Sequence, residues 1–384
     1  AVKKYYDDLS DNCLILVGDI PMILPETLNA VISSTVSQVN ETSASALLTA
    51  FVRDPFGYGR IVRSHGGNIV KIVEEKDASD AEKLINEINT SVYCFEKKIL
   101  FEYLENISSD NSQKEFYLTD IVDNLVKNGK QVKGFAVKNT IEAEGINNRA
   151  DLAVLEKAMQ KRINRGHMLS GVTFKDPDTS FVGPEVIIGS DTTIEPSCLI
   201  KGHTKIGQNC IIGPFTQIED CTICDGTKIN KSVLQGAVIG RLNNIGPTSY
   251  IRPGTVTGDK VKIGACCEIK KSRISDGSKI PHLSYIGDAQ IGANVNIGAG
   301  TITCNYDGFL KNKTIIEDGV FIGSDTMLVA PVRIGKGAVT AAGSAIVEDV
   351  PGDCLAIERS KQANIEAGAI KFREKKEKQK LNQN

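Results

Sequence analysis

The chain has 384 residues, of which 41% are hydrophobic and 24% are charged, and its formal net charge is -2. This length exceeds what one hydrophobic core usually supports, so two domains are expected. The near-neutral charge provides no general attraction for nucleic acid. No apolar run is long enough to cross a bilayer, so we do not expect membrane insertion.

The first 150 residues have the pattern of an α/β domain. Residues 13–17 form a short apolar run before Gly18 and Asp19, which predicts a buried strand with a carboxylate at its C-terminal edge. Pro25 and the apolar stretch after it predict a helix, and residues 68–73 and 90–95 predict strands.

A further helix is expected between the two domains. Residues 151–165 carry apolar side chains at helical spacing, and Gly166 is expected to be the C-terminal cap.

An aliphatic residue then recurs at every sixth position, in a first unbroken run of Val182, Ile188, Ile194, Ile200, Ile206, Ile212 and Ile218. The count slips twice and resumes as far as Ile346. A period of six is typical of a parallel β-helix, in which three six-residue phrases close one triangular coil. The period breaks at residues 303–313, which predicts a loop projecting from the coils.

Ten cysteines are scattered along the chain without a secretory signal, which favours reduced thiols and a cytoplasmic location. Cys221 and Cys224 form a lone CxxC motif. A metal or redox site would need a second pair or another context, so packing of small apolar side chains is the favoured interpretation. The stretch KFREKKEKQK near the C-terminus is expected to be a solvated basic tail.

Motifs along the whole chain resemble those of the bacterial bifunctional N-acetylglucosamine-1-phosphate uridyltransferase/glucosamine-1-phosphate N-acetyltransferase family. The similar stretches include, in chain order, Gly18-Asp19-Ile-Pro, Gly57-Tyr-Gly-Arg60, Glu87-Ile-Asn-Thr90, Tyr117-Leu-Thr-Asp120, Glu144-Gly-Ile-Asn-Asn-Arg149, His282-Leu-Ser-Tyr285 and Asn296-Ile-Gly-Ala-Gly-Thr-Ile-Thr-Cys-Asn-Tyr-Asp-Gly308.

The resemblance implies a nucleotidyltransferase-like, Rossmann-like α/β domain over residues 1–148 and a linker helix over 149–178. A left-handed hexapeptide β-helix acetyltransferase domain over 179–352 and a basic tail over 353–384 would follow. It also implies a homotrimer with active sites between subunits. Periodicity alone does not determine handedness.

The implied acetyltransferase reaction is direct attack of the glucosamine-1-phosphate amine on acetyl-CoA. His282 matches the general base, a role that suits a side chain whose ordinary pKa is near 6.5. Glycines beside it would let backbone N–H groups approach the thioester or a phosphate. Other matches are Arg252, Lys270, Tyr285 and Asn296 for the sugar phosphate, Ala299, Asn305, Tyr306, Ser324, Ala342 and Arg359 for acetyl-CoA, and Lys311 on a loop reaching the neighbouring subunit.

Cys304 raises the alternative of a covalent acetyl intermediate, but no partner in the sequence indicates an activated thiolate. Direct transfer is therefore expected.

For the first domain the resemblance implies uridylyl transfer from UTP, giving UDP-N-acetylglucosamine for peptidoglycan and lipopolysaccharide precursors. Asp19 and Asn147 match Mg²⁺ ligands, and Mg²⁺ takes few protein oxygens. The nucleotide-sugar contacts would be Gly59, Glu74, Asn89, Thr119 and Asn147.

The family's glycine-rich nucleotide loop does not precede Asp19, and Val17 stands where the family often has Tyr. We therefore expect a uridyltransferase domain without its N-terminal part and an impaired uridylyl transfer.

Two other protein classes share features with this sequence. A γ-class carbonic anhydrase shares the hexapeptide pattern but needs three zinc-binding histidines, and the four present are scattered. A non-catalytic assembly or regulatory subunit with the same two kinds of domain remains the alternative. Retention of His282, Arg252 and Lys270 together favours the enzyme.

Overall fold

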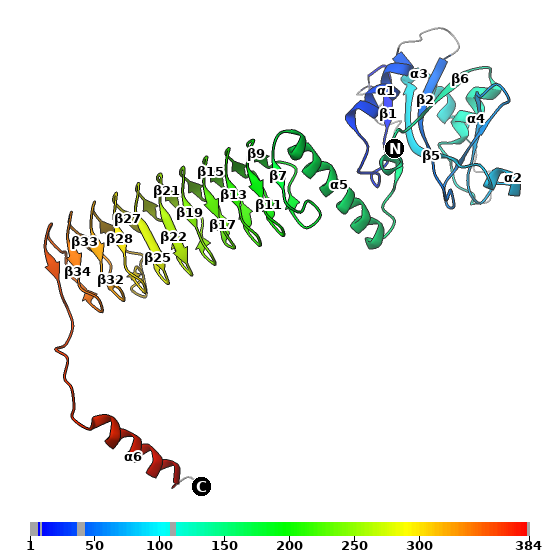
Figure 1. Cartoon of the computed structure of the whole chain (residues 1–384). Helices are drawn as coiled ribbons and strands as arrows, with labels where there is room; N and C mark the ends of the chain where they lie inside the picture. The colour runs from blue at the N-terminus through cyan, green and yellow to red at the C-terminus, as the bar shows by residue number, and fades with distance from the viewer. Residues whose placement is uncertain (1–6, 8–9, 37–42, 108–112, 382–384) are drawn as a thin grey trace. The chain divides into compact units, whose positions relative to one another are not determined.

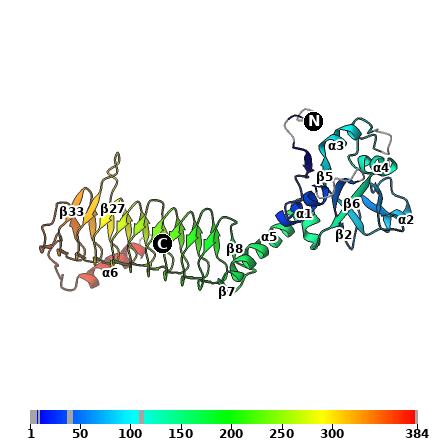
Figure 2. The same ribbon diagram turned by 90° about the horizontal axis from the view of Figure 1, so that it is seen from above.

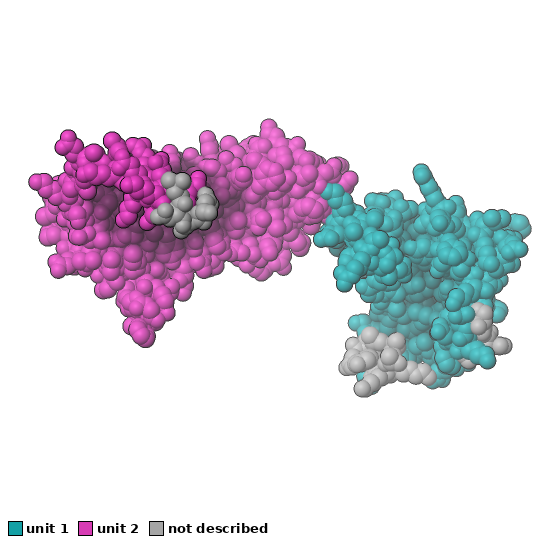
Figure 3. Space-filling model, turned by 90° about the horizontal axis from the view of Figure 1, so that it is seen from below, with its two compact units in different colours: residues 1–159 teal, residues 160–384 magenta. Residues whose placement is uncertain are grey.

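The computed structural model describes residues 7, 10–36, 43–107 and 113–381, and the chain divides into two compact units, residues 1–159 and 160–384 (Figures 1 and 3). The first unit contains a six-stranded mixed sheet in the order β4-β3-β5-β2-β6, with β1 also paired to β5. β2 and β6 are parallel, and the other pairs are antiparallel. The strands are β1 (Asn12–Ile15), β2 (Ser43–Phe51), β3 (Arg60–Arg63), β4 (Ile69–Val73), β5 (Glu87–Glu96) and β6 (Gln131–Ala136).

Helices cover both faces of this sheet. Leu100, Ile121 and Leu125 from two helices are fully buried in one cluster with strand residues, and Val31 is buried in another cluster. The α/β prediction is therefore confirmed, as are the predicted helix after Pro25 and the strands at 68–73 and 90–95. The helices are α1 (Pro25–Val36), α2 (Asp80–Lys83), α3 (Lys97–Leu104), α4 (Asp120–Lys127) and the 3₁₀ turn η2 (Thr140–Ala143).

The predicted helix at 151–165 is longer than expected. It is α5 (Arg149–Leu169), and Gly166 lies inside it rather than at its end. The chain leaves the helix at Gly171, whose φ of +92° is the left-handed conformation that glycine adopts without a Cβ penalty. In its second half, Gln160 and Asn164 are buried and donate side-chain hydrogen bonds to Ser180 O, which caps the first coil of the second unit.

The second unit is a parallel β-solenoid with three faces, seen along its length in Figures 1 and 2. The first face contains β7 (Thr173–Phe174), β10 (Thr193–Ile194), β13 (Ile211–Ile212), β16 (Lys228–Ile229), β19 (Asn244–Ile245), β22 (Lys262–Ala265), β25 (Lys279–His282), β28 (Asn296–Ile297), β31 (Phe321–Ile322), β34 (Val339–Thr340) and β36 (Leu355–Ala356).

The second face contains β8 (Phe181–Val182), β11 (Leu199–Lys201), β14 (Gln217–Glu219), β17 (Val233–Gln235), β20 (Tyr250–Ile251), β23 (Glu268–Lys270), β26 (Tyr285–Gly287), β29 (Ile302–Cys304), β32 (Met327–Val329) and β35 (Ala345–Ile346). The third face contains β9 (Ile187–Ile188), β12 (Lys205–Ile206), β15 (Thr222–Ile223), β18 (Val238–Ile239), β21 (Val256–Thr257), β24 (Arg273–Ile274), β27 (Ala289–Ile291), β30 (Thr314–Ile316) and β33 (Val332–Ile334). We call the turn from the first to the second face the first corner, and the turn from the second to the third face the second corner.

The residues of the six-residue period fill the interior of the solenoid, as predicted. Ile200, Ile212 and Ile251 have no exposed surface, and threonine replaces the aliphatic residue at Thr303 and Thr340. The slips in the count are phrases of five residues, such as Ile218 to Ile223, in which a corner is one residue shorter and the interior position is still filled. Each coil therefore keeps its register although the sequence count changes.

The predicted loop lies between β29 and β30 and projects from the solenoid (Figure 2). It covers residues 305–313, so it begins later than expected. Thr303 belongs to the strand because it is fully buried and accepts a hydrogen bond from Gly287 N. The basic tail ends in α6 (Gly368–Leu381), whose side chains are almost all exposed.

Candidate functional site

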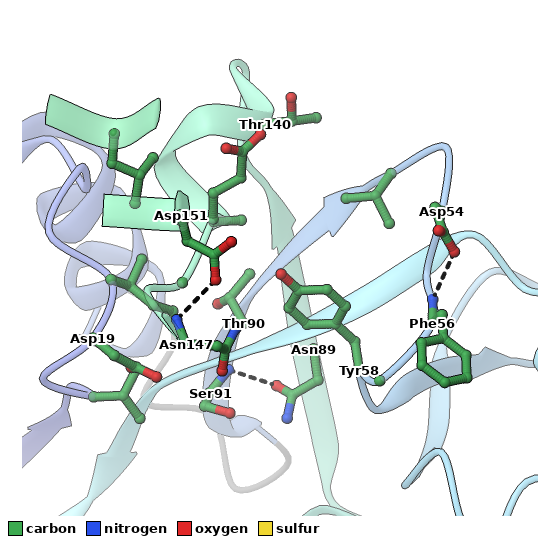
Figure 4. A pocket seen from close by; sticks show the side chains of 18 of the residues that line it. Asp19, Asp54, Phe56, Tyr58, Asn89, Thr90, Ser91, Thr140, Asn147 and Asp151 are labelled. Carbon is green, nitrogen blue, oxygen red and sulfur yellow. Dashed lines mark hydrogen bonds between the residues drawn. The ribbon is translucent and has the colours of Figure 1, made fainter. Parts of the chain in front are cut away.

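A cavity of about 1080 Å³ lies in the first unit (Figure 4). The segment after β1, the turn between β2 and β3, the middle of β5 and the segment from η2 to α5 all contribute side chains to it. Three of the predicted nucleotidyltransferase residues line this cavity: Asp19, Asn89 and Asn147.

Asp19 and Asn147 come from two segments that are held together. Ile146 N donates a hydrogen bond to Asp19 O at 2.9 Å, and Figure 4 shows both side chains on the same side of the cavity. Asn147 is fixed from the other direction, because its N–H donates to Asp151 Oδ2 at 3.0 Å in the first turn of α5. A carboxylate side chain and an amide side chain therefore come from neighbouring segments of the cavity wall.

The other predicted nucleotide-sugar residues form a cluster beside the cavity. Thr119 Oγ1 donates to Glu74 Oε1 at 3.1 Å, and a Cβ on Gly59 would lie 3.3 Å from Glu74 Oε2, so a side chain at Gly59 would crowd this carboxylate. Asn89 N donates to Gly59 O at 2.8 Å, which links the cluster to the cavity. Burial raises the pKa of Glu74, while the hydrogen bond from Thr119 opposes the shift.

Tyr58 was not predicted, yet it lines the same cavity. Burial raises the pKa of its phenol, and the negative charges of Glu144, Asp151 and Asp19 act in the same direction. Asp54 adds a further carboxylate to the lining, against one cation, Arg53. Carboxylates therefore outnumber cations in the lining of this cavity, which suits the binding of a hard cation such as Mg²⁺. Within the described part of the chain no three His, Cys, Asp or Glu side chains are grouped as metal ligands, so a metal here would take few protein ligands.

In the second unit the first corner aligns residues that are far apart in the sequence. His282, Ala299, Ser324 and Ala342 each stand two positions after an interior residue, on four successive coils. Neighbouring coils are about 4.8 Å apart, so these residues form a ladder of about 14 Å. Past His282 the ladder carries only small side chains, and Arg359 donates a hydrogen bond to Ala342 O at its far end, at 2.8 Å.

The glycines of this corner have a different role from the one expected. Gly298 N donates to Ile322 O at 2.8 Å, so its N–H group is already used. A Cβ at Gly298 would lie 2.4 Å from Ser324 N, which shows that this glycine permits the close packing of two coils. Gly300, with a φ of +76°, donates through its N–H to His282 O.

The predicted sugar-phosphate residues lie mainly on the second face. Tyr285 stands on β26, and the two cations follow the interior residues of the two preceding coils. Arg252 Nη1 donates to Glu268 Oε1 at 2.7 Å, and Lys270 Nζ lies 3.9 Å from Asp288 Oδ2. Asn296 is the first residue of β28, on the first face. His282, at the first corner, therefore lies between Asn296 and the sugar-phosphate residues of the second face.

The remaining predicted residues lie at the second corner, in the projecting loop. Asn305 is buried, whereas Tyr306 and Lys311 are exposed, with Lys311 Nζ 4.8 Å from the centre of the Tyr306 ring. The three residues of β26 separate the two corners by about 10 Å. The predicted acetyl-CoA residues therefore form two groups on opposite edges of one face.

Neither Cys304 nor Cys221 has the features of a reactive thiol. Burial raises the pKa of Cys304, which disfavours the thiolate. Cys221 of the CxxC motif is buried, its Sγ lies 3.2 Å from Glu219 O, and burial raises its pKa as well. These observations favour packing over metal binding or covalent catalysis.

Comparisons with known proteins agree with this division of the chain. A family model described as "Nucleotidyl transferase" matches residues 1–140, and one described as "GMPPB C-terminal domain" matches residues 182–264. A curated relative from Carboxydothermus hydrogenoformans, named "Bifunctional protein GlmU", is 51% identical over 95% of this chain and 81% of its own length. Proteins of the same name from Geobacillus sp. and Desulfitobacterium hafniense are each 48% identical, over 94% and 93% of this chain and 78% of their own lengths.

These comparisons do not support the expected loss of the N-terminal part of the first domain. Among the described residues, no helix is both long and apolar enough to span a bilayer.

Proposed function

The chain belongs to the family of the bifunctional protein GlmU, and from this premise we propose that it acetylates glucosamine-1-phosphate with acetyl-CoA and that its first unit serves uridylyl transfer. The observation that carries the acetyltransferase proposal is the first-corner ladder, with a histidine at one end and small residues beyond it. Such a ladder offers a narrow track of small side chains for an extended thioester arm, with a base where the track ends. The non-catalytic assembly subunit is set aside, because the relatives named above are bifunctional proteins.

In the proposed reaction His282 removes a proton from the amine of glucosamine-1-phosphate. Its side chain is exposed at the corner, and its backbone oxygen is held by Ser284 Oγ at 2.8 Å, which fixes the position of the residue. The free amine then attacks the carbonyl carbon of the thioester. CoA leaves as a thiolate, which takes up a proton and becomes the free thiol. Because burial raises the pKa of Cys304, we propose one direct transfer without an acetyl-cysteine intermediate.

Arg252 and Lys270 would hold the phosphate of the sugar, and Tyr285 and Asn296 would contact its ring. Both cations have an acidic partner in the structure, Glu268 for Arg252 and Asp288 for Lys270. Each carboxylate restrains the position of its cation, which prepares the pair to hold a phosphate. Ala299, Ser324, Ala342 and Arg359 would contact acetyl-CoA along the ladder.

We also propose that the active form is a homotrimer. Asn305, Tyr306 and Lys311 would contact acetyl-CoA, yet they stand at the second corner, away from the ladder. A neighbouring copy that places its loop against the ladder would complete the site. The second face supports this. Its outward positions form one row in register, in which Gln217 and Glu268 interrupt apolar side chains that are exposed or half-buried: Phe181, Leu199, Val233, Tyr250, Ile302 and Met327.

For the first unit we propose that Asp19 and Asn147 hold Mg²⁺ and that the cavity binds the UTP and UDP-N-acetylglucosamine of the second reaction. The donor set fits the ion, since it consists of a carboxylate and an amide oxygen in a cavity rich in further carboxylates. Mg²⁺ would supply charge neutralisation for the phosphates. Both activities belong to a cytoplasmic supply of cell-wall precursors.

A mixing experiment tests the shared acetyltransferase site. His282→Ala chains and Tyr306→Ala chains are each expected to have little activity alone. When equal amounts are denatured and refolded together, about a quarter of the sites combine an intact corner with an intact loop from the neighbour, so about a quarter of the wild-type CoA release should return. A mixture as inactive as the separate variants, from chains that form trimers by analytical ultracentrifugation, would contradict the shared site.

A further inference from the structure

Asp288 has no assigned role, yet its carboxylate lies among groups proposed to bind both substrates. It accepts a hydrogen bond from Asn305 Nδ2 at 2.5 Å and lies 3.9 Å from Lys270 Nζ. The Asp288 and Lys270 side chains are each only 17% exposed. Asn305 stands at the start of the projecting loop, and Lys270 is one of the two phosphate-binding cations of the proposed function. One carboxylate therefore contacts both a proposed sugar-phosphate residue and the base of the loop that would complete a neighbouring copy's site.

The backbone of Asp288 holds the other end of the loop. Its N–H donates to Lys270 O at 3.0 Å, and its carbonyl accepts a hydrogen bond from Thr314 N at 3.4 Å, at the residue where the chain returns from the loop. The loop is also closed across its base, since Asn312 N donates to Asn305 O at 2.7 Å. Asp288 thus contacts the first residue of the loop through its side chain and the first residue after it through its backbone.

The side chains around Asp288 are closely packed, which leaves no room for a side chain at the neighbouring Gly287. A Cβ on Gly287 would lie 2.5 Å from Tyr285 Oη and 2.7 Å from Asn305 Nδ2, so the phenol and the amide converge over this glycine. Without the carboxylate, the amide of the buried Asn305 would lose its acceptor, and an unsatisfied buried donor is costly. Lys270 would lose the group that restrains its ammonium.

We propose that Asp288 is a positioning residue of the acetyltransferase, which sets the base of the loop and the phosphate-binding ammonium of Lys270 in one geometry. This inference rests on the proposed function. It predicts that the binding of both substrates depends on the Asp288 carboxylate although neither substrate touches it. Acetyl-CoA would be affected through Asn305 and the loop, and the sugar phosphate through Lys270.

Two substitutions separate these effects. Asp288→Asn keeps an oxygen that can accept from Asn305 but removes the charge beside Lys270, so the KM for acetyl-CoA should stay within about twofold of wild type while the KM for glucosamine-1-phosphate rises about tenfold. Asp288→Ala removes both contacts and should raise both KM values. If the carboxylate acted only as a repulsive charge near the phosphate, Asp288→Asn would lower the KM for glucosamine-1-phosphate, and the proposal would be overturned.

Asp220 provides a matched control. It occupies the same position of the second corner four coils earlier, with a φ of +50° against +51° for Asp288, and its Oδ1 accepts a hydrogen bond from His203 N at 2.9 Å. Asp220→Asn should leave both KM values unchanged. If it changed them as Asp288→Asn does, the effect would be a general weakening of the solenoid.

A double-mutant cycle then tests the bond to Asn305. If Asp288 acts on acetyl-CoA through this amide, the double variant Asp288→Ala with Asn305→Ala should have the same KM for acetyl-CoA as the more damaged single variant. Additive increases would refute that route. The proposed function itself is judged separately by the wild-type chain: if it releases no CoA, the proposed function fails, whereas a failure of this inference leaves the wild-type activity intact.

Discussion

Replacing Gly298 with alanine should damage both stability and acetyl-CoA binding. The added Cβ would lie 2.4 Å from Ser324 N, 2.6 Å from Gly323 C and 2.7 Å from Ile322 O, all backbone atoms of the next coil. Ordinary contact would require these coils to separate locally by about 1 Å, which weakens the hydrogen bond from Gly298 N to Ile322 O. Overpacking costs about 1–3 kcal/mol and the weakened bond about 1, so we expect about 2–4 kcal/mol of lost stability.

The assay is thermal unfolding of the solenoid followed by circular dichroism, together with the KM for acetyl-CoA. A loss of this size should lower the apparent Tm by roughly 5–15 °C, and the KM should rise because Ala299 and Ser324 would move apart. Gly166→Ala is the control, since a Cβ there meets no atom within 4 Å and alanine favours the helix by about 0.5–1 kcal/mol. A Gly298→Ala chain with wild-type Tm and KM would refute the reasoning.

Arg252→Ala should raise the KM for glucosamine-1-phosphate about tenfold or more and leave that for acetyl-CoA nearly unchanged, and steady-state kinetics with each substrate varied would show an equal rise in both if the assignment were wrong. Cys304→Ala should release CoA at close to the wild-type rate, and a complete loss of activity together with mass-spectrometric detection of an acetylated Cys304 in the wild type would contradict direct transfer. Burial raises the pKa of Glu74, so the contribution of this group to stability is present below its unfolded pKa and is lost as the pH rises through its folded pKa. Glu74→Gln should therefore be more stable than wild type at pH 7 but not at pH 4, as measured by thermal unfolding of the first unit. A stability difference that is the same at both pH values would exclude this cause.

The interior of the solenoid could be predicted from the sequence because each face of each coil needs one apolar side chain, and this requirement imposes the six-residue period. The five-residue phrases could not be placed, since a corner can lose one residue without moving an interior side chain, as between Ile218 and Ile223. The sequence also predicts too short a helix for α5, because Gly166 resembles a cap in sequence whereas Gly171 adopts the left-handed conformation.

The candidate site was predicted as a set of residues but not as an arrangement. His282, Ala299 and Ser324 are separated by unequal stretches of sequence, and only the stacking of coils places them in one ladder. Asp288 carried a weak signal, since it stands two positions after an interior residue, as Asp220 does. Its bond to Asn305 depends on the path of the loop, which no periodic pattern describes.

Acetyl transfer by this chain with His282 as the base has a simple test: free CoA is measured after mixing the chain with acetyl-CoA and glucosamine-1-phosphate, beside a His282→Ala variant with an unchanged circular dichroism spectrum. We predict rapid release from the wild type, dependent on the sugar phosphate, and a loss of at least about a hundredfold in the variant. Equal release from both chains, or none from a folded wild type, would contradict the account.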